Sequence, residues 1–242
     1  MRPPAPSSLA LKPFRNLAAT RTPDGSTFTL HEHDGEFFLK LNGRQLMSTT
    51  STSSELLLAQ VACEGLSRHR EPRVLIGGLG LGYSLQRVLE IVGPGATVEV
   101  AELLPDVVAW NRQFLMGVNG RLLADPRVKV LIDDVYKAIK KGGPGVFDAI
   151  LLDVDNGPTS FVQPKNARLY DRNGFAVIRN SLTPNGKVAF WSAEKEPDFE
   201  RNLGRAGFKV EAVPAKANDH AKRYAHMVYV GTKADLPPPG KK

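Results

Sequence analysis

A glycine-rich segment, IGGLGLGYS, lies where a short apolar run gives way to a helical pattern. Glycines at such a junction let the backbone approach a ligand closely and leave the N-terminus of the following helix facing that ligand. This arrangement suits a nucleotide or a nucleoside, although a tight structural turn is an alternative. Residues 77–82 are called the glycine loop below, and the glycines assigned to cofactor binding are Gly77, Gly78, Gly80 and Gly82.

Five acidic side chains follow predicted strands farther along the chain. Glu102 comes about 20 residues after the glycines, a spacing at which a carboxylate accepts hydrogen bonds from both ribose hydroxyls of a cofactor. NAD would use the same pair of features, and a solvated acid at the strand end is the simpler alternative. Asp133 and Asp134 end the next predicted strand, and Asp153 and Asp155 end the one after it.

The carboxyl ends of parallel strands meet at one edge of a sheet, where open α/β folds bind ligands. Five acids at this edge predict a local negative field that favours a cationic substrate and a cationic sulfonium. Adjacent carboxylates also raise one another's pKa, so one of them could act as a general base toward an ammonium group. Alternatively, one acid of each pair caps the following helix, and we expect this of Asp133 or Asp155.

Aromatic and metal-binding residue types add little to this site. Tyr170 and Trp191 are most simply core or pocket-wall residues, although Trp191 lies near the same edge and could contact an adenine or a substrate. The histidines form no recognisable metal set. The single cysteine, Cys63, excludes an internal disulfide and a cysteine-based zinc site. We therefore expect no metal.

The elements that must position these residues are strands alternating with amphipathic helices from residue 72 onward. This alternation predicts βα units and a parallel sheet. Two final strands are joined by a segment too short for a parallel crossover, so we expect them to pair antiparallel. Seven strands ending in such a pair predict an α/β fold with a Rossmann-like, methyltransferase-type sheet. The predicted strands span residues 73–78, 96–102, 128–134, 147–155, 186–193, 208–215 and 223–231, and the predicted helices span residues 82–91, 105–117, 167–181 and 197–206.

Upstream of this domain, residues 27–49 alternate apolar and polar side chains, with turn signals at Asp34-Gly35 and Asn42-Gly43. The pattern predicts a small antiparallel sheet, which a helix over residues 53–65 joins to the main domain. We therefore expect four segments: a flexible basic arm at 1–22, a small β-domain with its linking helix at 23–66, a nucleoside-binding domain at 67–232 and a disordered tail at 233–242.

The formal charge of +7 is concentrated in the two ends of the chain. The first 22 residues hold four basic and no acidic side chains, whereas the body is nearly neutral. We therefore expect no nucleic-acid partner. No run approaches the ~18 uninterrupted apolar residues of a membrane-spanning helix, and the N-terminus lacks the apolar region of a secretory signal. A cytoplasmic protein without a membrane partner is expected.

Several segments resemble the polyamine aminopropyltransferase family, the spermidine synthases and their relatives, over about residues 28–230. The resemblance implies transfer of an aminopropyl or related alkyl group to a cationic small-molecule amine. The donor would be a sulfonium nucleoside, either decarboxylated S-adenosylmethionine or S-adenosylmethionine itself. A homodimer is also implied. The matching segments are GGLGLG (77–82), VAE (100–102), IDDVY (132–136), FDAILLDVDNGP (147–158), RLY (168–170) and LTPNGKVAFW (182–191).

The resemblance also implies roles for individual residues. Glu102 would hold the ribose hydroxyls, Asp134 the adenine amino group, and Asp153 would deprotonate the attacking amine. The full sets are Asp153, Asp155 and Tyr170 for catalysis; Gly77, Gly78, Gly80, Gly82, Glu102, Asp133, Asp134 and Val135 for the cofactor; and Glu55, Asp153 and Trp191 for the substrate.

The chain departs from the family pattern at positions that would hold an amine. Gly80 stands where the family usually has an aspartate, Leu58 and Ala59 replace a tyrosine and a histidine, and Trp191 replaces a glutamine. These differences favour two alternatives, an S-adenosylmethionine-dependent methyltransferase and a catalytically silent nucleoside-binding paralogue. Residues 156–165 are the candidate lid over the site.

Overall fold

The computed structural model describes residues 13–154 and 164–234. It divides the chain into two compact units, residues 1–49 and residues 50–242. The smaller unit is a four-stranded antiparallel sheet with the strand order β1-β2-β3-β4. Its strands are β1 (Arg15–Arg21), β2 (Thr27–His33), β3 (Glu36–Leu41) and β4 (Arg44–Ser48).

The two predicted hairpin turns of this sheet are confirmed. Asp34 and Gly35 have φ of 52° and 84°, and Asn42 and Gly43 have φ of 49° and 81°. Two consecutive positive φ angles are what a type I′ turn requires, and this turn matches the twist of the strands that it joins. Asn-Gly and Asp-Gly sequences therefore place both turns correctly.

Strand β1 corrects the prediction of a flexible arm over residues 1–22. The strand pairs with β2 from Arg15 to Arg21, and the Arg15 guanidinium lies 2.6 Å from the Glu32 carboxylate on β2. The sequence of β1 shows little alternation, so pairing with a partner strand, rather than local pattern, produces it. Residues 1–12 lie outside the described residues.

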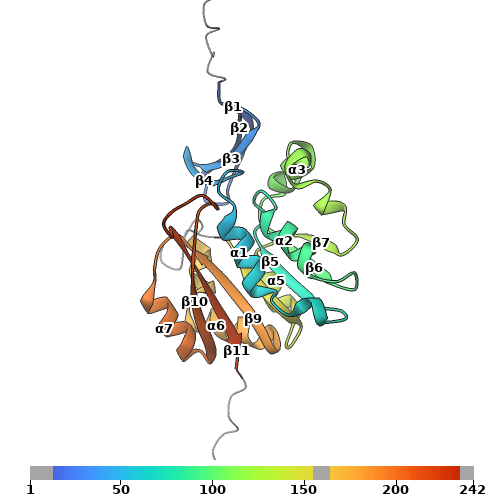
Figure 1. Cartoon of the computed structure of the whole chain (residues 1–242), viewed down its shortest axis with the longest axis vertical. Coiled ribbons are helices and arrows are strands. Elements are labelled where there is room, and N and C mark those ends of the chain that lie inside the picture. Colours follow the sequence, from blue (N-terminus) through green and yellow to red (C-terminus); the bar gives the residue numbers. More distant parts are fainter. Residues whose placement is uncertain (1–12, 155–163, 235–242) are drawn as a thin grey trace, which may run out of the picture. The chain divides into compact units, whose positions relative to one another are not determined.

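The larger unit contains a seven-stranded sheet with the order β10-β11-β9-β8-β5-β6-β7 (Figure 1). Strands β5 to β9 run parallel to one another, whereas β11 pairs antiparallel with both β9 and β10. This arrangement confirms the predicted fold class. The strands are β5 (Arg73–Gly77), β6 (Thr97–Glu102), β7 (Val128–Ile132), β8 (Phe147–Leu152), β9 (Leu182–Ser192), β10 (Phe208–Ala215) and β11 (His226–Lys233).

Helices cover both faces of this sheet (Figure 1). The α-helices are α1 (Ser53–Ala62), α2 (Tyr83–Ile91), α3 (Pro105–Gln113), α4 (Met116–Asn119), α5 (Val135–Gly142), α6 (Arg172–Ser181) and α7 (Pro197–Arg205), and the 3₁₀ helices are η1 (Leu66–Arg68), η2 (Leu122–Ala124) and η3 (Pro164–Leu169). Helix α5 has no counterpart among the predicted helices.

Two predicted helices are interrupted. The helix expected over residues 105–117 ends at Gln113, and the short α4 follows it. The helix expected over residues 167–181 is divided into η3 and α6, because the Asp171 side chain caps α6 by accepting a hydrogen bond from Gly174 N (2.7 Å). A strong capping residue inside an apolar pattern therefore marks a helix start.

Helix α1 belongs to the larger unit and not, as predicted, to the small β-domain. It contacts β9, β11 and α2, and its Leu58, Ala59 and Ala62 are fully or almost fully buried. The burial of this apolar face against the large sheet decides the unit to which the helix belongs.

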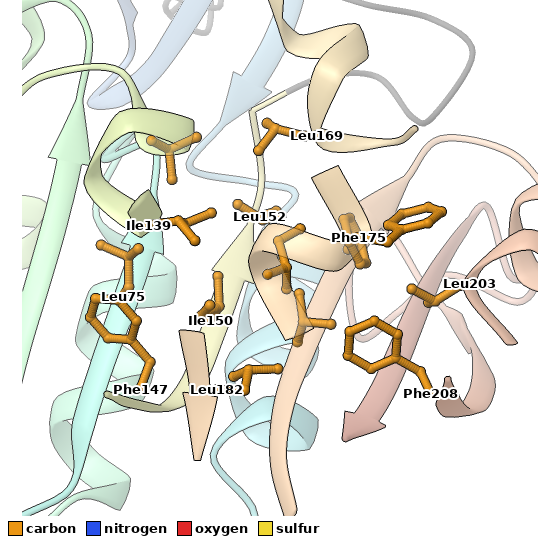
Figure 2. Close-up of a cluster of buried hydrophobic side chains, with 14 of the residues drawn as sticks. Leu75, Ile139, Phe147, Ile150, Leu152, Leu169, Phe175, Leu182, Leu203 and Phe208 are labelled. Carbon is orange, nitrogen blue, oxygen red and sulfur yellow. The ribbon is translucent and has the colours of Figure 1, made fainter. Parts of the chain in front are cut away.

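One buried layer of the larger unit lies between the sheet and helices α5, α6 and α7. Residues Ala149 to Leu152 of β8 are fully buried, as expected for a central parallel strand that is covered on both faces. Figure 2 shows the side chains that fill this layer, among them Phe147, Phe175 and Phe208. This packing fixes the strand ends that carry the candidate site.

Candidate active site

The parallel strands bring the predicted site residues to one edge of the sheet. Gly77 at the end of β5 pairs with Ala101 of β6 and with Leu152 of β8, and Glu102 pairs with Ile132 of β7. The glycine loop and the acids that follow β6, β7 and β8 are therefore neighbours at the carboxyl ends of four adjacent strands. The predicted juxtaposition is therefore found for Glu102, Asp133, Asp134 and Asp153, whereas Asp155 lies outside the described residues.

The glycine loop connects β5 to α2 and needs its glycines for two reasons. Gly78, Gly80 and Gly82 have φ of 85°, 51° and 91°, in the left-handed region that favours glycine. Space is also short, because a Cβ on Gly77 would lie 2.8 Å from Cγ2 of Val135. In this structure Val135, which the resemblance assigns to the cofactor, packs against the loop.

Glu102 ties the loop to the end of β6. Its Oε2 accepts a hydrogen bond from Leu79 N (2.9 Å) and its Oε1 accepts one from Leu104 N (2.9 Å). The side chain is only 7% exposed, and burial raises its pKa while the backbone donors oppose that shift. A carboxylate has four lone-pair sites, and the backbone N–H groups of Leu79, Leu103 and Leu104 interact with this one, so the side chain keeps capacity for one further donor such as a hydroxyl group.

Asp133 and Asp134 do not have the roles expected of an adjacent acid pair. Asp134, rather than the expected Asp133, caps α5, because its Oδ1 accepts a hydrogen bond from Lys137 N (3.1 Å). The same Oδ1 lies 2.6 Å from Nη2 of Arg168. Asp133 Oδ1 accepts a hydrogen bond from Asp134 N (2.9 Å), and its Oδ2 accepts one from Nζ of Lys141 (2.5 Å).

These partners also correct the expected electrostatics. The hydrogen bond from Lys141 lowers the pKa of Asp133, whereas mutual repulsion within the acid pair was expected to raise it. Lys141 and Arg168 each balance one aspartate at this edge. The negative field of the site is therefore weaker than the count of acids suggests, because cations from α5 and η3 lie among them.

Asp153 directly follows β8 and packs beside the glycine loop. Its N–H donates to Gly77 O (3.3 Å), and a Cβ placed on Gly78 would lie 2.9 Å from the Asp153 carbonyl oxygen. The Asp153 backbone and the loop are thus in close contact. Asp155 and most of the candidate lid at 156–165 lie outside the described residues.

The two aromatic candidates face different parts of the larger unit. The ring of Tyr170 lies 5.7 Å from that of Phe190 and 6.0 Å from that of Phe199, at the margin of the core. Trp191 follows Phe190 on β9 and therefore points to the other face of the sheet, where its ring lies 4.9 Å from that of His226. Trp191 Nε1 is buried without a hydrogen-bond partner in the part of the chain that the structure describes.

Glu55 lies beside the start of α2. It is buried in the first turn of α1, where its Oε2 accepts a hydrogen bond from Ser54 Oγ (2.6 Å). Burial raises its pKa. Burial, and secondarily the charge of Glu55, raises the pKa of Tyr83, the first residue of α2. Glu55 is thus close to the end of the glycine loop.

Sequence reasoning missed three residues that contact the site. Asn111 and Asn119 donate hydrogen bonds to Gly80 O (2.9 Å) and Leu81 O (3.0 Å), and Arg168 pairs with the capping aspartate of α5 as described above. One available signal was the position of Asn111, four residues after Val107 and therefore on the apolar face of its helix. A buried asparagine needs polar partners.

Within residues 13–154 and 164–234, no group of three or more histidine, cysteine, aspartate or glutamate side chains is arranged to hold a metal ion. No helix among the described elements is long and apolar enough to span a membrane.

The strand order and the loop at the sheet edge define a methyltransferase-type α/β fold. Solved structures share this fold. A spermidine synthase from Thermotoga maritima aligns with a TM-score of 0.70 at 16% identity, covering 91% of this chain and 73% of that one. A spermidine synthase in complex with the transition-state analogue AdoDATO aligns with a TM-score of 0.68 at 15% identity, with the same coverage.

Proteins with similar sequences come from the same group as those with similar structures. A polyamine aminopropyltransferase of Corynebacterium efficiens is 30% identical over 134 residues, which are 53% of this chain and 24% of that protein. One of Pyrobaculum calidifontis is 34% identical over 128 residues, 51% of this chain and 42% of that protein. The chain thus spans less than half the length of these curated relatives. The model of the spermine/spermidine synthase domain matches residues 57–205, more than half of the chain, so the chain belongs to the spermine/spermidine synthase family.

Proposed function

We propose that this protein transfers an aminopropyl group from decarboxylated S-adenosylmethionine to an amine. The observation that carries the proposal is the hydrogen bond between the Glu102 carboxylate and Leu79 N. It holds a candidate ribose-binding acid and a candidate nucleoside-binding loop together at the ligand-binding edge of the sheet. Membership of the spermine/spermidine synthase family supports the same chemistry.

In the proposed reaction, the amine nitrogen forms a bond to the aminopropyl carbon beside the sulfonium. The carbon–sulfur bond breaks, its electron pair goes to sulfur, and 5′-methylthioadenosine leaves. Asp153 takes the proton that the attacking ammonium must lose, with Asp155 and Tyr170 proposed to assist. The protein accelerates the step by holding nucleophile and donor in line and by keeping the nucleophile unprotonated.

Separate groups would bind the nucleoside donor. Glu102 would accept hydrogen bonds from the ribose hydroxyls, and Asp134 would accept one from the adenine amino group. Asp134 Oδ1 already accepts from Lys137 N and Arg168, which fixes the orientation of the carboxylate. Asp133 and Val135 would support this segment, and the glycine loop would approach the donor through its backbone.

The amine acceptor is proposed to differ from that of family members with the usual tyrosine and histidine. Leu58 and Ala59 stand at those positions and are fully buried in α1, so neither offers a polar group to an amine. Glu55 and Trp191 are the proposed acceptor-binding residues. An aromatic face attracts a cation, so Trp191 suits an amine whose charge is flanked by apolar groups.

Calorimetric titration tests the donor directly. Decarboxylated S-adenosylmethionine should bind more tightly than S-adenosylmethionine, and mixing it with diamines should yield an aminopropylated amine and 5′-methylthioadenosine, detected by mass spectrometry. Binding of neither nucleoside would refute the proposal. Binding without product from any amine tested would instead favour the catalytically silent paralogue.

An S-adenosylmethionine-dependent methyltransferase is the second candidate. The observation that favours it is Gly80, which leaves the glycine loop without the acid that would hold the amine of an aminopropyl group. This candidate predicts the reverse order of affinities, with S-adenosylmethionine the tighter ligand. Methylated products in the same mass-spectrometric assay would establish it.

The assembly and location of the protein are also proposed from the family resemblance. A homodimer is expected, and light scattering at micromolar concentration would contradict it by giving a mass near that of one chain, 26.4 kDa. A cytoplasmic location is expected, and fractionation of cells that express the protein would test it.

A further inference from the structure

We propose that Asn111 and Asn119 are positioning residues that hold the glycine loop in its ligand-binding conformation. The two residues, called the asparagine pair below, lie on α3 and at the end of α4. Neither belongs to a segment that resembles the family motifs. The proposal rests on the proposed function in so far as the glycine loop binds the nucleoside donor.

The asparagine pair is buried, and each side chain donates one hydrogen bond to the loop. Asn111 is 2% exposed and Asn119 is 8% exposed. Asn111 Nδ2 donates to Gly80 O and to Val107 O, both at 2.9 Å. Asn119 Nδ2 donates to Leu81 O (3.0 Å) and to Asn111 Oδ1 (2.6 Å). Two consecutive loop carbonyls are therefore bound by two side chains that also bind each other.

The loop needs such external bonds because its own sequence specifies little. A glycine populates positive and negative φ with similar ease, so a segment with glycines at 77, 78, 80 and 82 samples many conformations unless other groups restrain it. Within the loop, Gly82 N donates to Leu79 O (2.9 Å). The asparagine pair binds the carbonyl groups of the two peptides inside this turn, Gly80–Leu81 and Leu81–Gly82.

Fixing a carbonyl also fixes the N–H group of the same peptide. The C=O and N–H of a trans peptide point in opposite directions. When Asn111 holds Gly80 O, the N–H of Leu81 therefore points away from the asparagine pair. The pair thus sets the direction of the Leu81 N–H, whereas the N–H of Gly82, in the second peptide, already donates to Leu79 O (2.9 Å) within the loop.

A third side chain holds the loop from the sheet. Glu102 accepts from Leu79 N, while the asparagine pair donates to the carbonyls of the two following residues. A carboxylate therefore binds a loop N–H and two amides bind loop C=O groups. Together, the acceptor Glu102 and the donors Asn111 and Asn119 constrain both rotation and translation of residues 79–81. The Glu102 bond alone, or the asparagine bonds alone, would leave these residues partly free to move.

The glycine loop lies in close contact with the asparagine pair, and a cavity adjoins the pair. A Cβ on Gly82 would lie 2.8 Å from Asn119 Nδ2, so the loop approaches the pair as closely as a glycine permits. Behind the pair, Asn111 and Asn119 line a cavity of about 390 Å³ together with Arg112, Met116 and Arg121. Because both amides are buried and donate to loop carbonyls, their orientation is coupled to that of the loop backbone.

The test compares Asn111→Ala and Asn119→Ala with Asn202→Ala, an exposed asparagine on α7. In the ligand-free protein, deuterium exchange of the peptide that covers residues 77–82 should become about five- to tenfold faster in the first two variants. Their Kd for 5′-methylthioadenosine should rise by about tenfold, while kcat at saturating donor stays close to that of the unsubstituted protein. Asn202→Ala should change none of these.

Asn111→Asp keeps the size of the side chain but places an acceptor against Gly80 O, and it should reproduce the loss of binding if the alanine variant does not fold. Loop exchange and nucleoside affinity as in the unsubstituted protein, in a folded variant, would overturn the inference. If the unsubstituted protein binds no nucleoside, the proposed function fails, whereas deuterium exchange still decides whether the pair restrains the loop.

Discussion

At the residue scale, acids with similar sequence contexts have different states in the folded protein. Glu102 is buried and accepts backbone hydrogen bonds, and burial raises its pKa. Asp133 lies beside Lys141, whose hydrogen bond lowers the pKa of Asp133. Asp134 is a helix cap that also pairs with Arg168. The chemistry of each acid therefore depends on partners from other elements rather than on its place at a strand end.

Replacing Asp153, the proposed base, tests whether its carboxylate accepts the proton of the attacking amine. Asp153→Asn should reduce turnover by about 100-fold or more, because the amide cannot accept the proton of the ammonium nucleophile. Binding of 5′-methylthioadenosine should change little. Steady-state kinetics and calorimetry measure the two effects, with Asp198→Asn on the surface of α7 as the matched control. Unchanged turnover would remove Asp153 from the mechanism.

Cys63 should be inert in the native protein. Its side chain is fully buried, and burial raises its pKa to about 12, so the reactive thiolate is scarce below that pH. At pH 8 a thiol reagent should label the folded protein only at the rate of unfolding and should label it rapidly in denaturant. Mass spectrometry of the time course checks this. Rapid stoichiometric labelling without denaturant would contradict it.

At the element scale, two aspartate side chains that cap helix N-termini decide where helices begin. Asp134 caps α5 and Asp171 caps α6 through hydrogen bonds to the backbone N–H groups of Lys137 and Gly174. The residue types are the same, but only Asp134 immediately precedes Val135, whose side chain packs against Gly77 of the glycine loop. Removing each cap in turn therefore separates the effect of a lost cap on stability from its effect on nucleoside binding.

Asp134→Ala and Asp171→Ala should each lower the free energy of unfolding by about 1 kcal/mol, because each leaves a helix N-terminus without its acceptor. For a chain of this length that loss corresponds to a decrease in Tm of about 3 °C. Only Asp134→Ala should also weaken nucleoside binding. Thermal melts and titrations of both variants provide the measurement, and equal binding losses would exclude a specific role of Asp134 in binding.

At the scale of the whole molecule, an aromatic cluster joins α7 to the large sheet. The ring of Phe199 lies 5.0 Å from that of Phe190 and 5.2 Å from that of Tyr229, with Phe175 at 5.7 Å. Edge-to-face aromatic pairs add to the stability that burial supplies. The cluster therefore stabilises the antiparallel end of the sheet, far along the chain from the glycine loop.

Phe199→Ala should cost about 3–5 kcal/mol of unfolding free energy, because it removes buried contacts and leaves a cavity. Tyr224→Ala removes an aromatic side chain that is 65% exposed and should change stability by less than about 0.5 kcal/mol. Urea unfolding followed by circular dichroism compares the two variants. Similar midpoints would show that the cluster contributes less than its burial implies.

Hydrophobic periodicity and turn chemistry were enough to predict much of this architecture. The apolar runs before Gly77, Glu102 and Asp153 predicted the central strands, and the Asp-Gly and Asn-Gly turns predicted two hairpins. Strand β1 was not predicted, because its pairing with β2 depends on a partner rather than on its own pattern. No bounds were predicted for helix α5, although one acid of the Asp133-Asp134 pair was expected to cap a following helix; the structure gives that cap to Asp134 and not to Asp133.

The sequence by itself determined which strand ends carry the glycines and the acids, since strands of apolar residues must be buried and their polar ends must lie at the edge of the sheet. Only the tertiary structure decided the state of those groups. Lys141 and Arg168 balance two aspartates, the backbone of the glycine loop binds Glu102, and Asn111 and Asn119 hold the loop. Apart from Lys141 and Asp133, which are eight residues apart, these contacts join residues that are distant in sequence, and local periodicity carries no information about such pairs.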